Sequence, residues 1–398
     1  MTGLLGIVPQ PPGFAVDDAA VRDFLAGGVS ADAMAATGQD AGFHAEGDVW
    51  THTRMVVDAL VALPAWRGLD ADARAIVFAA SLLHDVGKPS TTRDEGGRLT
   101  SRGHSARGEH LVRRWLWRDG VPFGVREHVC ALVRHHQVPF FGVTRPAADA
   151  ARTAARLSLR LRHDWLCLVA EADARGRRCA DAADQARILD HVALWAEHCR
   201  ELGALDRPRA FASDHTRVVY LEADDAGRRS PDVLAHDDTA AEVVVLSGLP
   251  ATGKDSWLRA HRPELPVVSL DAMRAELDVD GADDQGAVIA AARDAARGHL
   301  RAATPFAWNA TNVSARVRGR VIELLRGYRA RVHVVYCEAP AEVQEARNRR
   351  RPSPVPAAAI DRMLDRWTVP ALDEAHAVTY AVDDDGPVAW PPPSTRTG

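Results

Sequence analysis

The stretch "EVVVLSGLPATGKDSW", residues 242–257, determines the fold class of the second half of the chain. It opens with a short run of valines, which is typical of a buried strand. Gly248 ends this run, and Gly253 and Lys254 follow after four more residues. A strand, a glycine turn of this spacing and a lysine predict a loop whose backbone N–H groups bind phosphate at the start of a helix.

The residues of this loop predict the cofactors ATP and Mg²⁺. Lys254 would bridge the β- and γ-phosphates of a nucleoside triphosphate. Asp255 departs from the usual pattern, because a serine or threonine normally follows the lysine and binds magnesium. Either the Asp255 carboxylate or the hydroxyl of Ser256 could take that role. The candidate cofactor-binding residues are therefore Gly248, Gly253, Lys254, Asp255 and Ser256.

Four more short apolar runs follow the loop, which argues against a chance match in an isolated turn. They lie at residues 266–271, 305–310, 332–337 and 377–382. Helical patterns separate them, at residues 284–302, 313–328, 341–351 and 356–367. Alternating strands and helices predict an α/β domain with a parallel sheet.

Asp271 ends the second of these predicted strands, within "SLDAMR". Ligands bind outside the carboxyl ends of such strands, so Asp271 could accept a proton from an attacking hydroxyl. Arg274 lies three residues later on the same helical face and could bind a phosphate of the acceptor. Alternatively, Asp271 only caps the next helix.

Further polar residues could complete this site. The run "EARNRRRP" carries Arg347 and Arg351 four residues apart on one helical face, where they could stabilise charge during phosphoryl transfer. The alternative is a solvated basic helix end. Asn309 and Asn312 end the third strand, either as site residues or as part of a turn.

Residues 50–200 have the periodicity of amphipathic helices. Four of their polar residues extend an apolar helical face: His52, His84, His136 and Asp173. One inward histidine is usually a satisfied core residue. Four such positions need a common partner, because buried polar groups must be paired. A divalent metal with imidazole and carboxylate ligands meets this need.

His52, the pair His84–Asp85 and Asp173 resemble the HD superfamily of metal-dependent phosphohydrolases, and "HAEGDVWTHT" (residues 44–53) is similar to the HD domains of tRNA nucleotidyltransferases. The resemblance implies that these four residues hold one metal ion. It also implies that His104 and His136 hold a second ion bridged by Asp85, on which hydrolysis would depend. His135 is the competitor of His136. Lys88 would contact a substrate phosphate or be solvated. The metal could be manganese, nickel, cobalt, iron or zinc.

In this order, the two motif sets resemble the bacterial HD-domain polynucleotide kinase family over roughly residues 40–385. The resemblance implies ATP-dependent phosphorylation of 5′-hydroxyl ends. It also implies removal of 2′,3′-cyclic, 2′- or 3′-phosphates from the ends of RNA or DNA. A ligase can then join these ends. One alternative is a kinase for a nucleoside or small metabolite fused to an HD nucleotidase. Another is a nucleotide-sensing module that gates the HD domain.

The composition limits the setting. The net charge of −5 provides no global basic field for nucleic acid, so such binding would use local patches. Five scattered cysteines favour a reducing cytosol, and no apolar run is long enough to span a membrane. We expect an all-α HD phosphohydrolase domain followed by an α/β P-loop kinase domain. The expected segments are an extension (1–40), the HD domain (41–204), a linker (205–240), the P-loop domain (241–385) and a loose tail (386–398).

Overall fold

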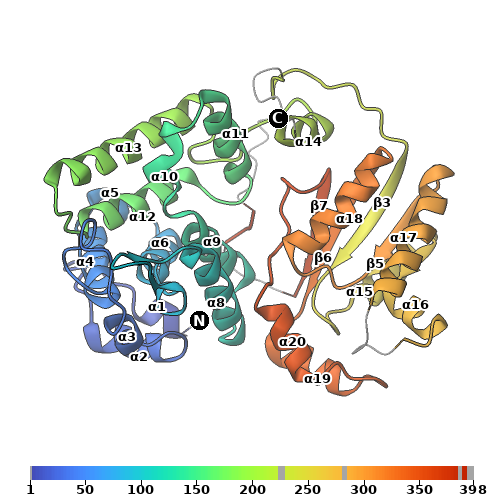
Figure 1. The fold of residues 1–398 in the computed structure, drawn as a ribbon, viewed down its shortest axis with the longest axis horizontal. Coiled ribbons are helices and arrows are strands. Elements are labelled where there is room, and N and C mark those ends of the chain that lie inside the picture. Colours follow the sequence, from blue (N-terminus) through green and yellow to red (C-terminus); the bar gives the residue numbers. More distant parts are fainter. Residues whose placement is uncertain (1, 223–228, 280–284, 384–387, 392–398) are drawn as a thin grey trace. The chain divides into compact units, whose positions relative to one another are not determined.

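The computed structural model describes residues 2–222, 229–279, 285–383 and 388–391. The chain divides into two compact units. A helical unit contains the residues up to 210 together with the C-terminal residues from 384 on, and a sheet unit contains residues 211–383 (Figure 1). Each is described here by itself.

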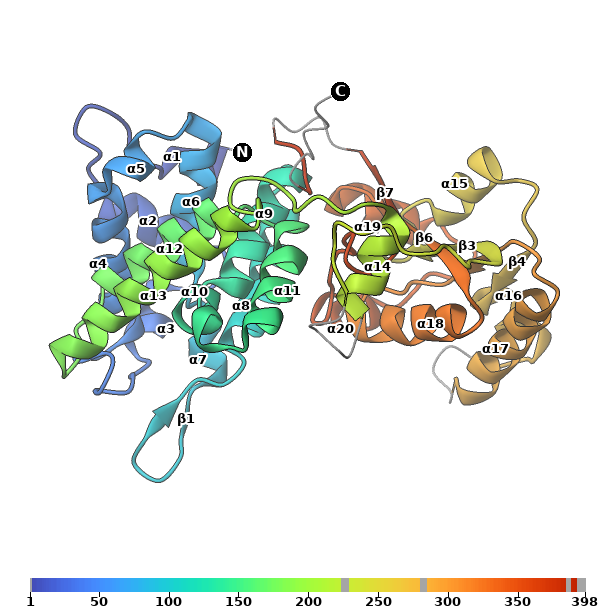
Figure 2. The same cartoon turned by 90° about the horizontal axis from the view of Figure 1, so that it is seen from above.

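The helical unit contains one short hairpin besides its helices. The strands of this hairpin, β1 (Arg93–Asp94) and β2 (Leu99–Thr100), extend from the unit beside α7 (Figure 2). Its helices are α1 (Thr2–Gly6), α2 (Asp18–Ala26), α3 (Ala31–Ala35), α4 (Val49–Ala62), α5 (Pro64–Arg67), α6 (Ala71–Leu83), α7 (Lys88–Thr91), α8 (His104–Arg118), α9 (Phe123–His135), α10 (Val138–Phe141), η1 (Gly142–Thr144), α11 (Ala147–Ser158), α12 (His163–Arg175) and α13 (Ala182–Glu201).

Helices α4, α6, α9 and α12 share one apolar core. Asp48 begins α4 by accepting a hydrogen bond from the backbone N–H of Thr51, and Asp70 begins α6 in the same way through Ala73. His84 and His136 are the residues that end α6 and α9, and His104 is the first residue of α8. Three of the predicted ligands therefore lie at helix ends, where the chain can turn a side chain toward its neighbours.

Residues 1–40, expected to be an N-terminal extension, contain three helices. Helices α1, α2 and α3 pack on the same core as α4 and α6, through buried residues such as Leu25 and Met34. Each helix buries only a few apolar side chains, and α1 and α3 have five residues each. Such short segments give too little periodicity for a sequence pattern to indicate them.

The sheet unit contains a five-stranded parallel sheet in the order β4-β5-β3-β6-β7. Its strands and helices are α14 (Asp214–Glu222), β3 (Ala241–Ser247), α15 (Lys254–His261), β4 (Val267–Ser269), α16 (Leu270–Glu276), α17 (Gly286–Arg301), β5 (Phe306–Asn309), α18 (Ala315–Gly327), β6 (Ala330–Glu338), α19 (Ala341–Arg349), α20 (Ala357–Leu364) and β7 (Ala377–Val382). The predicted α/β class and parallel sheet are confirmed.

Strand β3 lies at the centre of the sheet and is buried on both faces. Val243 and Val245 face a core formed with α17 and α18, whereas Val244 and Leu246 face Leu258 of α15. This alternation explains the continuous apolar run, because both faces of a parallel strand are covered by helices.

The segment expected to be a linker, residues 205–240, is divided between the units. Its helix α14 belongs to the sheet unit, because the buried guanidinium of Arg217 donates hydrogen bonds to the carbonyls of Leu372, Ala375 and His376. An arginine that satisfies several carbonyls at once gives no periodic signal in the sequence.

Residues 388–391, part of the tail expected at residues 386–398, pack on the helical unit, and residues 386–387 and 392–398 lie outside the described part of the chain. Trp390 is buried, packs edge-on against Phe123 and donates to the carbonyl of Arg160 at 2.9 Å. His128 of α9 lies 3.0 Å from the carbonyl of Ala389. No described helix combines the length and apolar character that crossing a bilayer requires.

Candidate functional site

Six predicted metal ligands meet in the interior of the helical unit. They come from α4, the ends of α6 and α9, the start of α8, and α12, and all are buried: His52, His84, Asp85, His104, His136 and Asp173. His136 joins this group, whereas its competitor His135 is not part of it among the described residues.

Asp85 lies at the centre of the group. Its Oδ2 is 3.1 Å from Nε2 of His84 and 3.8 Å from Nε2 of His52, whereas its Oδ1 is 3.4 Å from Nε2 of His104. On the first side, Asp173 Oδ1 lies 3.2 Å from Nε2 of His52. On the second side, the Nε2 atoms of His104 and His136 are 3.4 Å apart. Each oxygen of one carboxylate thus faces its own set of imidazoles.

The backbone fixes the tautomer of three of these histidines in the same way. Nδ1 of His84 donates to the carbonyl of Ser81, Nδ1 of His104 to that of Ser101, and Nδ1 of His136 to that of Val133, each at 2.8 Å. A carbonyl only accepts, so Nδ1 carries the proton and Nε2 is left to bind a ligand. The lone pairs of His84 and His104 therefore lie near the Asp85 carboxylate, and that of His136 lies near His104.

The charges of the group fit a divalent cation. Although burial opposes ionisation, His84 and Lys88 hold the pKa of Asp85 well below its usual range, and burial lowers the pKa of His136 to about 3. The Nε2 of His84 and the Oδ1 of Asp85 are buried without a hydrogen-bond partner in the described part of the chain. Imidazoles beside an ionised carboxylate are the donor set that transition metals prefer.

The donor atoms form two groups that share Asp85. One consists of His52, His84 and Asp85, and the other of Asp85, His104 and His136; within each, the donor atoms lie within 4.8 Å of one another. This grouping has the same composition as the two-ion arrangement implied by the resemblance, with Asp173 beside the first group.

Neighbouring charged groups hold the two carboxylates in place. Arg177 forms an ion pair with Asp173 and, although burial opposes ionisation, holds the pKa of that carboxyl well below its usual range. Lys88 is buried, lies 2.7 Å from Asp85 Oδ2 and donates to Gln39 at 2.5 Å. The alternative of a solvated Lys88 is therefore wrong, because the side chain is buried and its ammonium group contacts oxygens of Asp85 and Gln39.

In the sheet unit, the loop after β3 has the shape of a phosphate-binding turn. Gly248 has φ of 148°, and a side-chain Cβ there would lie 2.2 Å from the carbonyl of Cys337, so glycine is required. Gly253 also has a positive φ and directly precedes α15. The helix N-terminus therefore opens onto the loop, as anion binding requires.

Lys254 lies inside this loop. Its ammonium group donates to the carbonyls of Gly248 at 3.0 Å and Leu249 at 2.7 Å. Burial lowers the pKa of Lys254 to about 8. The ammonium thus lies within the turn, where it could meet a phosphate group.

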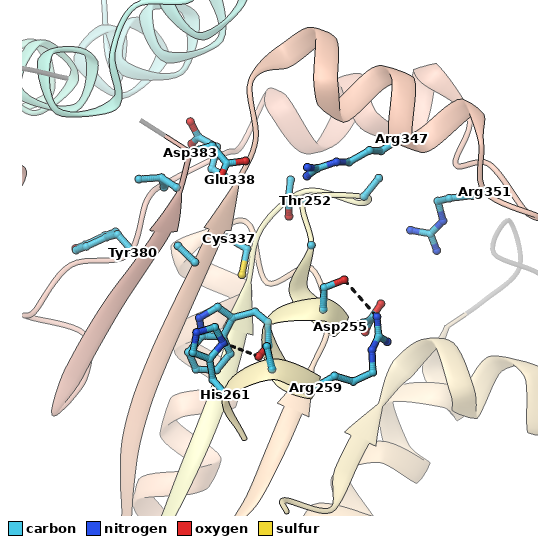
Figure 3. Close-up of a pocket in the computed structure, with 17 residues that line it drawn as sticks. Thr252, Asp255, Arg259, His261, Cys337, Glu338, Arg347, Arg351, Tyr380 and Asp383 are labelled. Carbon is cyan, nitrogen blue, oxygen red and sulfur yellow. Dashed lines mark hydrogen bonds between the residues drawn. The ribbon is translucent and has the colours of Figure 1, made fainter. Parts of the chain in front are cut away.

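A pocket of about 810 Å³ opens beside the loop, lined by α15, by the ends of β6 and β7, and by α19. Gln344 of α19 donates to the carbonyl of Pro250 in the loop at 2.9 Å. Arg347 and Arg351 follow Gln344 by three and seven residues and line the pocket, and Figure 3 shows them above Asp255 at the start of α15. At the other end of the pocket, Trp257 stacks on His261.

Asp271 lies in the first turn of α16, just beyond β4. It does not cap the helix, because Ser269 does so by accepting from the N–H of Ala272. Asp271 forms an ion pair with Arg274 and lies 3.8 Å from Arg351, and its side chain is 73% exposed. Arg274 also donates to Gln285 at 2.6 Å. Asp271, Arg274 and Arg351 therefore meet at the carboxyl edge of the sheet.

The two asparagines differ in role. Asn312 is buried and donates to the carbonyl of Leu246, which identifies it as part of a turn. Asn309, at the end of β5, donates to Asp255 at 2.5 Å. The hydroxyl of Ser256 accepts from Arg259 at 3.2 Å.

Two family models match the chain, one over each of the two candidate sites. Residues 49–185 match the family model described as the HD domain, and residues 243–370 match the one described as an AAA domain. The chain is an HD domain followed by a P-loop domain. Each match covers about a third of the chain, and together they include every residue named so far for the two sites except Gln39.

The HD domain has curated relatives. The chain is 32% identical over 198 residues to a multifunctional CCA protein of Burkholderia cenocepacia, covering 47% of this chain and 43% of that protein. It is 33% identical over 184 residues to a multifunctional CCA protein of Xanthomonas euvesicatoria, covering 44% and 42%. The chain thus spans less than half the length of these relatives.

Among solved structures, a putative kinase from Chloroflexus aurantiacus matches 36% of this chain and 86% of its own chain, with 18% identity and a TM-score of 0.29. A sugar kinase from Janibacter sp. matches 36% and 85%, with 17% identity and a TM-score of 0.29.

Three residues of the HD site were not singled out from the sequence: Glu46, Gln39 and Arg177. Oε1 of Glu46 lies 2.8 Å from Nδ1 of His52 and 2.9 Å from Nδ1 of His44. Glu46 and Gln39 precede α4, so helical periodicity gives them no orientation. Arg177 follows Asp173 by four residues, and this spacing could have indicated the pair.

Proposed function

We propose that the chain restores the ends of broken RNA. The P-loop domain would transfer the γ-phosphate of ATP to a 5′-hydroxyl end, and the HD domain would remove 2′,3′-cyclic, 2′- or 3′-phosphates. The observation that carries this proposal is the presence in one chain of a buried two-group imidazole–carboxylate cluster and a phosphate loop with an open acceptor side.

In the kinase half, the donor nucleoside would occupy the pocket beside α15, and the acceptor would approach Asp271. The 5′-oxygen would attack the γ-phosphorus, the bond from that phosphorus to ADP would break, and the hydroxyl proton would pass to Asp271. Lys254, Arg347 and Arg351 would stabilise the charge on the transferred group. Arg274 would bind a phosphate of the acceptor strand.

The exposure of Asp271 supports a polynucleotide acceptor. Its side chain is 73% exposed, beside two arginines, so an acceptor can extend away from the sheet. A small metabolite would normally be enclosed by its kinase.

In the HD half, the imidazole Nε2 atoms and the two carboxylates would hold divalent metals such as manganese, nickel, cobalt or zinc. When bound, these metals would supply hydroxide near neutral pH and polarise the phosphoester. Arg177 and Lys88 keep Asp173 and Asp85 ionised, and the backbone carbonyls keep the histidine tautomers correct for binding. Broken RNA with a cyclic phosphate and a 5′-hydroxyl would be treated at both sites, and its two ends could then be joined by a ligase.

The test gives labelled ATP to the full chain with a 5′-hydroxyl RNA oligomer, a DNA oligomer and a nucleoside. Label on an oligomer supports the proposal, and label on the nucleoside alone supports a small-molecule kinase. ATP binding without transfer would indicate a sensing module. Asp271→Ala should abolish phosphorylation and spare cyclic-phosphate hydrolysis, and Asp85→Ala should do the reverse. Hydrolysis by metal-free protein would refute the metal assignment.

A further inference from the structure

Asp255 occupies the position after the phosphate-loop lysine, where a hydroxyl residue normally binds magnesium. It is the second residue of α15. Its Oδ1 accepts a hydrogen bond of 2.5 Å from the side-chain amide of Asn309. Because Asn309 ends β5, which pairs with β3, the neighbouring strand holds this carboxylate beside the loop.

Ser256 is the competing candidate. Successive residues of a helix point about 100° apart, so only one of the two can face the site that lies next to Lys254. The hydroxyl of Ser256 accepts from Arg259 of the same helix, and both side chains are exposed. The contact between Asp255 and Asn309 instead directs Asp255 toward the carboxyl edge of the sheet.

Other charged groups of the transfer site lie at the same edge. Asn309 pairs with Ser269 across β4 and β5, and Asp271 follows Ser269 by two residues. The ammonium group of Lys254 lies within electrostatic reach of both Asp255 and Asp271. A cation beside Asp255 would therefore lie between the phosphate loop and the acceptor carboxylate.

We propose that Asp255, oriented by Asn309, is the protein ligand of the magnesium ion that accompanies the nucleotide, and that it makes nucleotide binding strictly dependent on that ion. Magnesium prefers hard oxygen ligands, which a carboxylate supplies. Unlike a hydroxyl, a carboxylate without a cation repels the polyphosphate. The inference deepens the proposed function and rests on the part of it that assigns a triphosphate to the loop.

The test measures the affinity of the full chain for ATP by titration calorimetry, with excess Mg²⁺ and with EDTA. No acceptor is present, so the result does not depend on which end is phosphorylated. The proteins are the wild type, Asp255→Asn, Ser256→Ala, Asn309→Ala and, as matched control at an exposed carboxylate of α17, Asp294→Asn. EDTA also strips the HD site, but it does so in every protein, so the comparison between variants removes that effect.

We expect removal of Mg²⁺ to weaken ATP binding at least about tenfold more in the wild type and in Asp294→Asn than in Asp255→Asn. With EDTA, Asp255→Asn should bind ATP more tightly than the wild type, because the repulsive charge is gone. Asn309→Ala should show an intermediate dependence, since the carboxylate remains but loses its orientation.

An equal Mg²⁺ dependence in the wild type and Asp255→Asn would overturn this proposal alone. So would a dependence that survives in Asp255→Asn but disappears in Ser256→Ala, because the ligand would then be Ser256. If the wild type binds no ATP under either condition, the kinase half of the proposed function fails together with this inference.

Discussion

Glu46 Oε1 lies 2.8 Å from Nδ1 of His52, whose Nε2 faces Asp173 at 3.2 Å. The other three histidines of the cluster donate Nδ1–H to backbone carbonyls, so His52 alone among them is oriented by a carboxylate. A carboxylate behind a metal-binding imidazole fixes its tautomer and increases its basicity. Glu46 is thus a positioning residue for the first ligand group.

Glu46→Gln should weaken metal binding by the HD domain about 10- to 100-fold, because the amide keeps an oxygen beside Nδ1 of His52 but removes the negative charge. Metal content after dialysis against a series of buffered metal concentrations measures this. Glu201→Gln, at an exposed position of α13, serves as control. Unchanged affinity in Glu46→Gln would mean that the carboxylate only orders the loop before α4.

Arg177→Ala should destabilise the HD domain by about 3–5 kcal/mol in metal-free protein, because it leaves the buried carboxylate of Asp173 without its guanidinium partner. Arg175→Ala removes a pair of the same spacing, with Glu171, on the exposed side of α12, and should cost less than about 1 kcal/mol. Urea denaturation followed by circular dichroism compares the two. Equal losses would show that Asp173 does not depend on its ion pair.

Nucleotide affinity should decrease as the pH rises through about 8, because burial lowers the pKa of Lys254 to about 8 and only its charged form attracts phosphate. Because the pKa of Lys254 is lower in the folded chain, the unfolded chain binds more protons at this residue than the folded chain does between about pH 8 and 10.5. The contribution of Lys254 to the free energy of unfolding therefore increases with pH in this range. Titrations with ATP from pH 7 to 9.5 measure the affinity. Lys254→Arg should remove the inflection, and an identical pH profile in that variant would refute the assignment.

Gly124→Ala should displace the C-terminal segment, because the new Cβ would lie 1.7 Å from the carbonyl of Val388. We expect faster hydrogen exchange at the start of α9 and new protease cleavage near Trp390. Gly319→Ala, in α18, has nothing within 4 Å of its new Cβ and is the matched control. Retained protection of α9 in Gly124→Ala would mean that the segment contributes nothing to its packing.

The fold was predictable where the signal is local. The valine run of β3, the glycine spacing after it and the repeated strands each lie within a short stretch, and the predicted parallel α/β domain is confirmed. Four of the six candidate metal ligands could be selected because helical periodicity gives the direction of the side chain, as for His52 on the inner face of α4, whereas Asp85 and His104 came from the family resemblance.

The remaining features depend on contacts between distant residues. Lys88 and Gln39 are 49 positions apart, and His128 and Ala389 are 261 apart. Nothing in either local pattern indicates such a partner. The cap of α16 could not be predicted either. Asp and Ser are both good helix caps, and only the structure shows that Ser269 and not Asp271 takes that role.

The return of residues 388–391 to α9 affects the order in which the chain can fold during synthesis. Every described strand of the P-loop sheet precedes Trp390 in the chain, so α9 gains its contact with residues 388–391 only after the P-loop domain has been translated. A polypeptide that stops short of Val388 would carry a complete nucleotide loop, and α9 would lack the contact between His128 and Ala389.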